Sequence, residues 1–297
     1  LGYPSQAEFK ASEVEEQLVR VGGVPRDGVI WKPFISAPVP FRYRNKTEFS
    51  FTFNRWKTRG EMEANPDSEH EPGLGFHVPG FWDKILDVHD CHLIPDYGNE
   101  IRNALRDEAI ALGLSFWQPR AKVGALRTAM LRSNQSGDWM LIIQWGEHPG
   151  ADGFTLMHRM AERFDRLVSL YWGLNEKVND SMYDVDLHLF HGIEALEETM
   201  ESAIEGGRAL KFLISPKSFY QTNPKQAHRL YSEALRAAGL TGGETVYDLY
   251  TGTGTIALFM AQVAGKVVGV ESVREAVDAA FRNAERNGIS NATFEAG

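Results

Sequence analysis

The feature that most constrains the fold is a regular alternation of strand and helix patterns after residue 207. The runs ETVYDLY, KVVGVE and NATFEA are typical of strands, and helix patterns lie between them. KFLIS and a helix that opens at Asn223-Pro224 come before them, and Ser272 and Glu275 have the spacing of a capping box for the last helix. Strands that alternate with helices at this spacing are joined by right-handed crossovers and lie parallel. We predict an α/β fold with a parallel, Rossmann-like sheet, truncated because only three of its strands are present.

The turn between the first of these strands and its helix is rich in glycine. Gly252, Gly254 and Ala257 satisfy the G-x-G-x-x-G/A pattern, which lets a nucleotide approach the backbone. Glu271 ends the next strand, where an acid binds the hydroxyls of an adenosine ribose. NAD and S-adenosylmethionine both carry that ribose, but Asp248 can face a cationic sulfonium, and the helix before the first strand also favours S-adenosylmethionine. The purely structural alternative is a tight turn, with Glu271 as a favourable charge at a helix start.

Two basic stretches suggest contact with RNA, although the formal net charge is -9. In residues 41–60, six cations accompany one acid, and Phe49, Phe51 and Phe53 alternate so that their rings share one face of a strand. Residues 117–132 contain four cations and no acid. Cations beside exposed rings suit looped or single-stranded RNA, whereas the more common explanation is a strand with buried rings and solvated cations. The cations are Arg42, Arg44, Lys46, Arg55, Lys57 and Arg59 in the first stretch, and Arg120, Lys122, Arg127 and Arg132 in the second.

The chain before residue 208 mixes helix and strand patterns. Helices are predicted at 7–21 and 97–112, and the strands 126–134 and 139–145 flank the turn-rich QSGD and predict a hairpin. The acidic residues 194–207 end in two glycines, which favours a boundary there. We therefore predict three parts: a linker helix in residues 1–37 that packs on the catalytic domain, a central α+β RNA-binding domain in residues 38–207, and a Rossmann-like domain in residues 208–297.

Composition narrows the cellular setting. No run of eighteen apolar residues is present, so we expect no membrane span. The first ten residues lack the basic and apolar regions of a signal peptide, and one cysteine excludes a disulfide within the chain. We expect a cytoplasmic monomer.

Five segments together resemble the RNA uracil-5-methyltransferases that use S-adenosylmethionine. In chain order they are RNKTEFSF, VGALRTAMLR, ISPKSFYQTNPKQA, DLYTGTGTIAL and VVGVESVREAV. The resemblance implies a methyltransferase domain in residues 208–297, in which Gln221, Tyr250, Thr255 and Glu271 contact S-adenosylmethionine. It also implies transfer of the methyl group to C5 of a uracil in RNA, with 23S rRNA favoured over tRNA.

The same resemblance implies that the chain is a fragment. The family's nucleophilic cysteine and general base are expected beyond Gly297, so no catalytic residue is assigned here and the chain is expected to be inactive alone. The family's small amino-terminal RNA-binding barrel is also missing. Two other functions remain open: a catalytically silent RNA-binding module with a vestigial cofactor fold, and, less favoured, a nicotinamide oxidoreductase.

The single cysteine, Cys91, lies in DVHDCHLIP. It fits a small buried hydrophobic side chain, and His89 and His92 are too close to it in sequence for a regular zinc site. The resemblance implies another role, as the fourth cysteine ligand of an iron-sulfur cluster. The other three ligands of that cluster would lie upstream of Leu1, so only the full-length parent would hold it.

Overall fold

The computed structural model describes residues 1–66 and 70–297, which divide into two compact units, Leu1–Phe41 and Arg42–Gly297. The first unit contains the helix α1 (Tyr3–Glu16), a π-helical turn (Gln17–Val21) and a 3-10 turn (Arg26–Gly28). The hydroxyl of Tyr3 accepts a hydrogen bond from the Ala37 amide at 2.7 Å. The helix expected over residues 7–21 is confirmed, and its packing on a catalytic domain stays a prediction.

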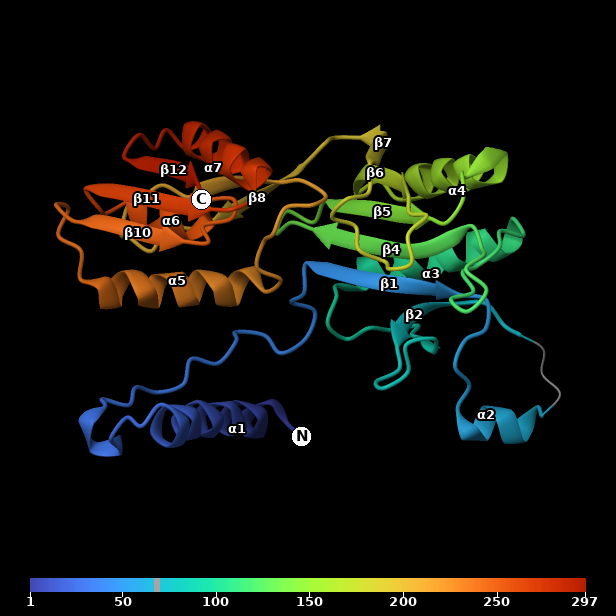
Figure 1. Cartoon of the computed structure of the whole chain (residues 1–297), viewed down its shortest axis with the longest axis horizontal. Helices are drawn as coiled ribbons and strands as arrows, with labels where there is room; N and C mark the ends of the chain where they lie inside the picture. The colour runs from blue at the N-terminus through green and yellow to red at the C-terminus, as the bar shows by residue number, and fades with distance from the viewer. Residues whose placement is uncertain (67–69) are drawn as a thin grey trace. The chain divides into compact units, whose positions relative to one another are not determined.

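The second unit begins with a seven-stranded sheet in the order β3-β2-β1-β4-β5-β6-β7 (Figure 1). Its neighbours run antiparallel except β5 and β6, which are parallel and joined through α4. The expected hairpin is confirmed, with Leu131 opposite Leu141. The bounds are β1 (Lys46–Thr52), α2 (Arg59–Ala64), β2 (Gly73–His77), β3 (Ile85–Asp87), α3 (Asp96–Ala111), β4 (Leu126–Ser133), β5 (Trp139–Trp145), α4 (Gly150–Arg163), β6 (Leu167–Leu174) and β7 (Leu187–Gly192).

The alternating phenylalanines of β1 belong to the core of this sheet. Phe49 and Phe51 are buried, and they share one hydrophobic cluster with residues of α3 and α4 such as Leu105 and Met157. The Phe51 ring meets Phe116 edge-on at 5.0 Å. These two rings cannot stack on RNA bases, so the suggestion of an RNA-binding aromatic face is wrong for them.

A second hydrophobic cluster connects the seven-stranded sheet to the rest of the unit. It runs from Met130 and Ile142 through the hairpin of β8 (Leu196–Met200) and β9 (Leu210–Ile214) to Phe259 and Phe294. β8 lies inside the acidic stretch 194–207 and pairs antiparallel with β9. The hairpin therefore spans residue 207, where the sequence suggested a domain boundary.

The remaining elements form the expected Rossmann-like sheet, whose strands β10, β11 and β12 are parallel and adjacent in that order (Figure 1). Asn223 caps α5 by accepting from the Gln226 amide, and Gly239 ends it in the left-handed region at φ 58°. The predicted capping box at Ser272 is wrong, because its hydroxyl donates to Glu271 instead. The bounds are α5 (Pro224–Ala238), β10 (Thr245–Leu249), α6 (Thr255–Ala261), β11 (Lys266–Glu271), α7 (Arg274–Arg286) and β12 (Ala292–Ala296).

Within the described ranges, no helix combines the length and the apolar character that crossing a membrane requires.

Candidate cofactor site

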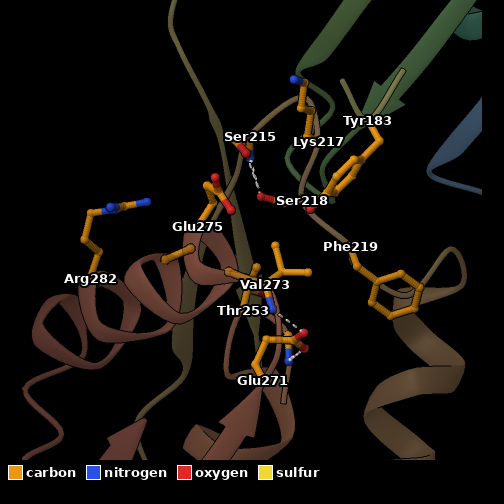
Figure 2. A pocket seen from close by; sticks show the side chains of 13 residues that line it. Tyr183, Ser215, Lys217, Ser218, Phe219, Thr253, Glu271, Val273, Glu275 and Arg282 are labelled. Carbon is orange, nitrogen blue, oxygen red and sulfur yellow. Dashed lines mark hydrogen bonds between the residues drawn. The ribbon is translucent and has the colours of Figure 1, made fainter. Parts of the chain in front are cut away.

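A pocket of about 430 Å³ opens where β11 ends and α7 begins. Its walls come from the glycine loop after β10, from the first turns of α7 and from the stretch that follows β9. In Figure 2, Glu271 lies at the lower end of the pocket and Lys217 at the upper end, with Phe219 and Tyr183 to one side. Parallel α/β sheets bind ligands at this position, beyond the carboxyl ends of their strands.

Glu271 is fixed at the floor of the pocket by hydrogen bonds to the backbone. Its Oε2 accepts from the Gly252 amide at 3.0 Å, and its Oε1 accepts from the Val273 amide at 3.0 Å and from the Ser272 hydroxyl at 3.2 Å. The Val273 bond is the largest cause that holds the pKa of Glu271 below its usual value, so the side chain is ionised at neutral pH. A carboxylate has about four acceptor sites, which leaves capacity for a ribose hydroxyl.

The glycine loop has the left-handed turns that its sequence predicts. Gly252 and Gly254 have φ values of 57° and 81°. A Cβ at Gly254 would lie 3.1 Å from side-chain carbons of Ala280 and Phe294, so glycine also allows close packing there. Tyr250 has φ 63° without being glycine, which costs about 1–2 kcal/mol. The loop therefore includes one strained residue immediately before its glycines.

Asp248 serves the loop rather than the pocket. Its Oδ2 accepts from the Thr251 hydroxyl at 2.7 Å and from the Ala257 amide at 3.0 Å. Burial raises the pKa of this carboxyl above its usual value. Asp248 does not line the pocket, so the structure does not support the expected contact with a sulfonium.

The other predicted cofactor residues lie outside the pocket lining. Tyr250 is 88% exposed, and Thr255 begins α6 with its hydroxyl 3.5 Å from that of Thr253. The Gln221 side chain hydrogen-bonds Tyr231 on α5. Of the four, the structure places only Glu271 in this pocket, and contact of Gln221, Tyr250 and Thr255 with the cofactor stays a prediction.

The wall after β9 is attached to the seven-stranded sheet by a buried arginine. Arg132 on β4 is 3% exposed, and its guanidinium donates to the backbone carbonyls of Ser215, at 2.7 Å, and Ser218. Burial lowers the pKa of Arg132 to about 10, which keeps the group charged at neutral pH. A second link runs from Asn45, whose Nδ2 donates to the Gln221 carbonyl at 3.2 Å. The central sheet thus positions one wall of the pocket.

Only part of the second basic stretch is therefore exposed to solvent. Arg127 is 1% exposed, and it donates to the carbonyls of Asn175, Lys177 and Asn179 and to the Asp180 carboxylate. Arg127 and Arg132 are structural arginines, and assigning them to an RNA-binding patch was wrong. Their acceptors are distant in sequence, so the stretch alone had no signal for their burial.

Acidic side chains form ion pairs with most of the cations in the first basic stretch. Arg42 pairs with Asp90 and Asp96, each at 2.8 Å. Three further cations have acidic partners, so the positive balance within residues 41–60 does not make a uniformly positive surface. These pairs are Arg55 with Glu61 and Glu71, Lys57 with Glu71, and Arg59 with Glu63.

Cys91 is buried, and its amide donates to Asn99 Oδ1 at 2.9 Å. The neighbouring histidines point to acids instead, His89 to Asp87 at 3.4 Å and His92 to Asp90 at 3.3 Å. Over residues 1–66 and 70–297, no group of three or more potential ligands is placed to hold a metal ion. The iron-sulfur role of Cys91 has no support here.

The sequence did not single out several pocket residues. Lys217 and Phe219 lie within ISPKSFYQTN, so that motif was their only available signal. Tyr183 comes from the segment between β6 and β7, where nothing in the sequence indicated a role in a ligand site.

Comparison with known proteins finds sequences and a solved structure that are similar to this chain. Residues 240–297 match a family model described as a methyltransferase domain. A Bacteroides thetaiotaomicron protein described as an RNA methyltransferase is 40% identical over 300 residues, which cover 100% of this chain and 64% of that protein. A similarly described protein from Porphyromonas gingivalis is also 40% identical, over 99% of this chain and 63% of its own length.

A solved structure matches over the same extent. The tRNA (uracil-54, C5)-methyltransferase of Pyrococcus abyssi, in complex with S-adenosyl-L-homocysteine, has a TM-score of 0.72 and 25% identity, covering 100% of this chain and 63% of that one. This match confirms the predicted α/β class and the Rossmann-like methyltransferase fold. The expectation of a truncated fragment is not supported, because the matches run through the whole of this chain; the chain spans less than two thirds of the relatives' length.

Proposed function

We propose that this chain, a relative of the RNA methyltransferases along its whole length, binds S-adenosylmethionine in the pocket at Glu271 and serves methyl transfer to RNA. When bound, this cofactor supplies an electrophilic methyl group on a sulfonium. The chain's own contribution is to hold the ribose at Glu271 and to enclose the cofactor between the glycine loop, α7 and the wall after β9. The seven-stranded sheet and its loops would hold the RNA.

The geometry of Glu271 carries this proposal. An ionised carboxylate with spare acceptor capacity stands at the end of the second parallel strand, beside a glycine loop whose Gly252 amide already orients it. That combination suits a hydroxyl of an adenosine ribose. The pocket of about 430 Å³ lies within the usual size range of small-molecule sites.

We further propose C5 of a uracil as the methyl acceptor. Its support is the resemblance of five ordered segments and the solved relative, which is itself a tRNA (uracil-54, C5)-methyltransferase. The expected preference for 23S rRNA depended on the iron-sulfur role of Cys91, which has no support. The methyltransfer assay should therefore include uracil-containing loops of both 23S rRNA and tRNA as substrates.

Calorimetry with S-adenosylhomocysteine, S-adenosylmethionine and NAD tests the cofactor assignment. Removing the carboxylate in Glu271→Ala should weaken both S-adenosyl ligands by about 1.5–3 kcal/mol, the range for hydrogen bonds to charged groups. That loss is roughly ten- to 150-fold in Kd. Glu285→Ala, on the exposed side of α7 outside the pocket, is the matched control and should bind as the parent does.

Two results would contradict the cofactor assignment. Tight binding of NAD without binding of either S-adenosyl compound would assign the pocket to a dinucleotide. An unchanged Kd in Glu271→Ala would show that the ribose does not bind at this carboxylate.

A further inference from the structure

A second cavity lies in the seven-stranded sheet region and shares no lining residue with the cofactor pocket. It is a groove of about 240 Å³ lined by β1, β2, the segment from β2 to β3 that contains Trp82, the segment that precedes β4 and the segment that follows β6. The residues that matter for its chemistry are Ser50, His77, Trp82, Trp117, Lys122 and Asp180. We call this cavity the tryptophan groove.

Two indole rings in the groove are paired with guanidinium groups. The Arg127 guanidinium lies 4.1 Å from the centre of the Trp117 ring, and that of Arg120 lies 5.8 Å from the Trp82 ring. Arg120 is also tied to Asp83 at 2.6 Å, which fixes it beside Trp82. Trp82 is nevertheless 63% exposed. A large ring that is held in a groove but left open to water is a platform on which a flat, apolar ligand can stack.

Polar groups at the groove suit the edge and the backbone of a nucleotide. Asp180 uses Oδ1 for Arg127, while the carboxylate as a whole stays partly exposed and can accept from a base amino group. His77 Nε2 lies 3.2 Å from the Ser50 hydroxyl, and both can exchange hydrogen bonds with a ligand. The Trp82 ring, the Asp180 carboxylate and the His77–Ser50 pair thus line one cavity.

Lys122 supplies the positive charge at the rim. It is exposed, and over residues 1–66 and 70–297 no acid lies within 4 Å of its ammonium group. Its backbone has φ 57°, a left-handed conformation that costs a lysine about 1–2 kcal/mol. Strained residues of this kind are concentrated at ligand sites, where the surrounding structure maintains them.

We propose that the tryptophan groove binds an unpaired nucleobase of the RNA substrate, stacked on Trp82, with the adjoining phosphate at Lys122. This proposal rests on the proposed function for the identity of its ligand as RNA. An unpaired base fits better than a base pair, because only an unstacked base exposes both its ring face and its hydrogen-bonding edge. The segment between β6 and β7 lines both cavities, through Asp180 in the groove and Tyr183 in the cofactor pocket, so a base held in the groove would orient the strand relative to the methyl donor.

Fluorescence anisotropy with a labelled, uracil-containing single-stranded RNA and a duplex of the same length tests the proposal. Trp82→Ala should weaken single-strand binding at least fivefold, the effect of losing one base stack, and should change duplex binding little. Trp82→Phe keeps a ring and should restore most of the affinity. Lys122→Ala should reduce the slope of log affinity against log salt by about 0.7 in magnitude.

Controls separate this proposal from the cofactor assignment. Tyr247→Ala removes an exposed ring of β10 outside the groove and should leave RNA binding unchanged. The groove variants should bind S-adenosylhomocysteine with the parent's Kd, so a parent that binds RNA but no S-adenosyl ligand would refute only the proposed cofactor. Parent-like RNA affinity in Trp82→Ala, equal losses on single strand and duplex, or no RNA binding by the parent would each overturn the groove proposal. Selective binding of a peptide in place of RNA would overturn it as well.

Discussion

The cofactor pocket and the tryptophan groove differ in how their residues are brought together. At the pocket floor, Gly252, Glu271 and Val273 belong to one strand-turn-helix-strand unit and are connected by backbone amides. The groove combines residues from β1, from β2 and the segment after it, from the segment before β4 and from the segment after β6. Side chains such as Arg127 connect some of these parts. A local site depends on turn geometry, whereas a non-local site depends on the fold of the whole sheet. Their responses to mutation should differ accordingly.

The largest expected effect tests whether every wall of the cofactor pocket is independent of the seven-stranded sheet. Arg132→Met removes two hydrogen bonds from a buried cation to the carbonyls of Ser215 and Ser218. We expect a loss of about 3–6 kcal/mol in the free energy of unfolding, measured in urea, because each of the two bonds contributes about 1.5–3 kcal/mol. Binding of S-adenosylhomocysteine should also weaken, because the wall after β9 loses its anchor.

Arg59→Met is the matched control for that change. Arg59 and its partner Glu63 are both exposed, so loss of this pair should cost less than about 1 kcal/mol. Arg132→Lys keeps the charge and should recover part of both losses. If Arg132→Met bound the ligand with the parent's Kd, the pocket would be independent of the central sheet.

An intermediate effect concerns the strained residue of the glycine loop. Tyr250→Gly relieves the left-handed strain at an exposed position, offset in part by the greater freedom of glycine in the unfolded chain. We expect a net gain of about 0.5–1 kcal/mol in urea unfolding. Tyr250→Ala keeps the strain and should show no gain. Weaker S-adenosylmethionine binding in both variants would support the predicted contact of the tyrosine ring, whereas unchanged binding would contradict it.

The smallest expected effect is a pH dependence at Glu271. Its pKa in the folded chain lies below the unfolded value, which is about 4.3 for glutamate. The carboxylate therefore stabilises the folded chain above that unfolded value, and this contribution disappears as the pH falls through the lower folded value. Urea unfolding should find the parent more stable than Glu271→Gln at pH 7, with the difference shrinking as the pH falls below about 4.3. A constant difference would show that titration of this carboxyl is not involved.

The parts that the sequence predicted are those that neighbouring residues determine. The strand ends, the glycine turn and Glu271 follow from patterns within a few tens of residues, and so does the hairpin of β4 and β5. The capping box failed because Glu271, one residue earlier, accepts from the Ser272 hydroxyl. The RNA-binding role predicted for the basic stretches failed for another reason. The sequence shows the cations, but it does not show which acid or carbonyl accepts a hydrogen bond from each of them. The carbonyl that accepts from Arg132 belongs to Ser215, 83 positions along the chain.

The hairpin of β8 and β9 has a consequence for how the second unit melts. Because β8 comes from the stretch before residue 207 and β9 from the stretch after it, a cut at that residue would separate two paired strands and open the cluster that connects both sheets. Loss of either sheet therefore exposes the apolar side of the other. Heating Arg42–Gly297 should give one cooperative transition rather than two, and cleavage of the chain at the glycine pair should destabilise both sheets.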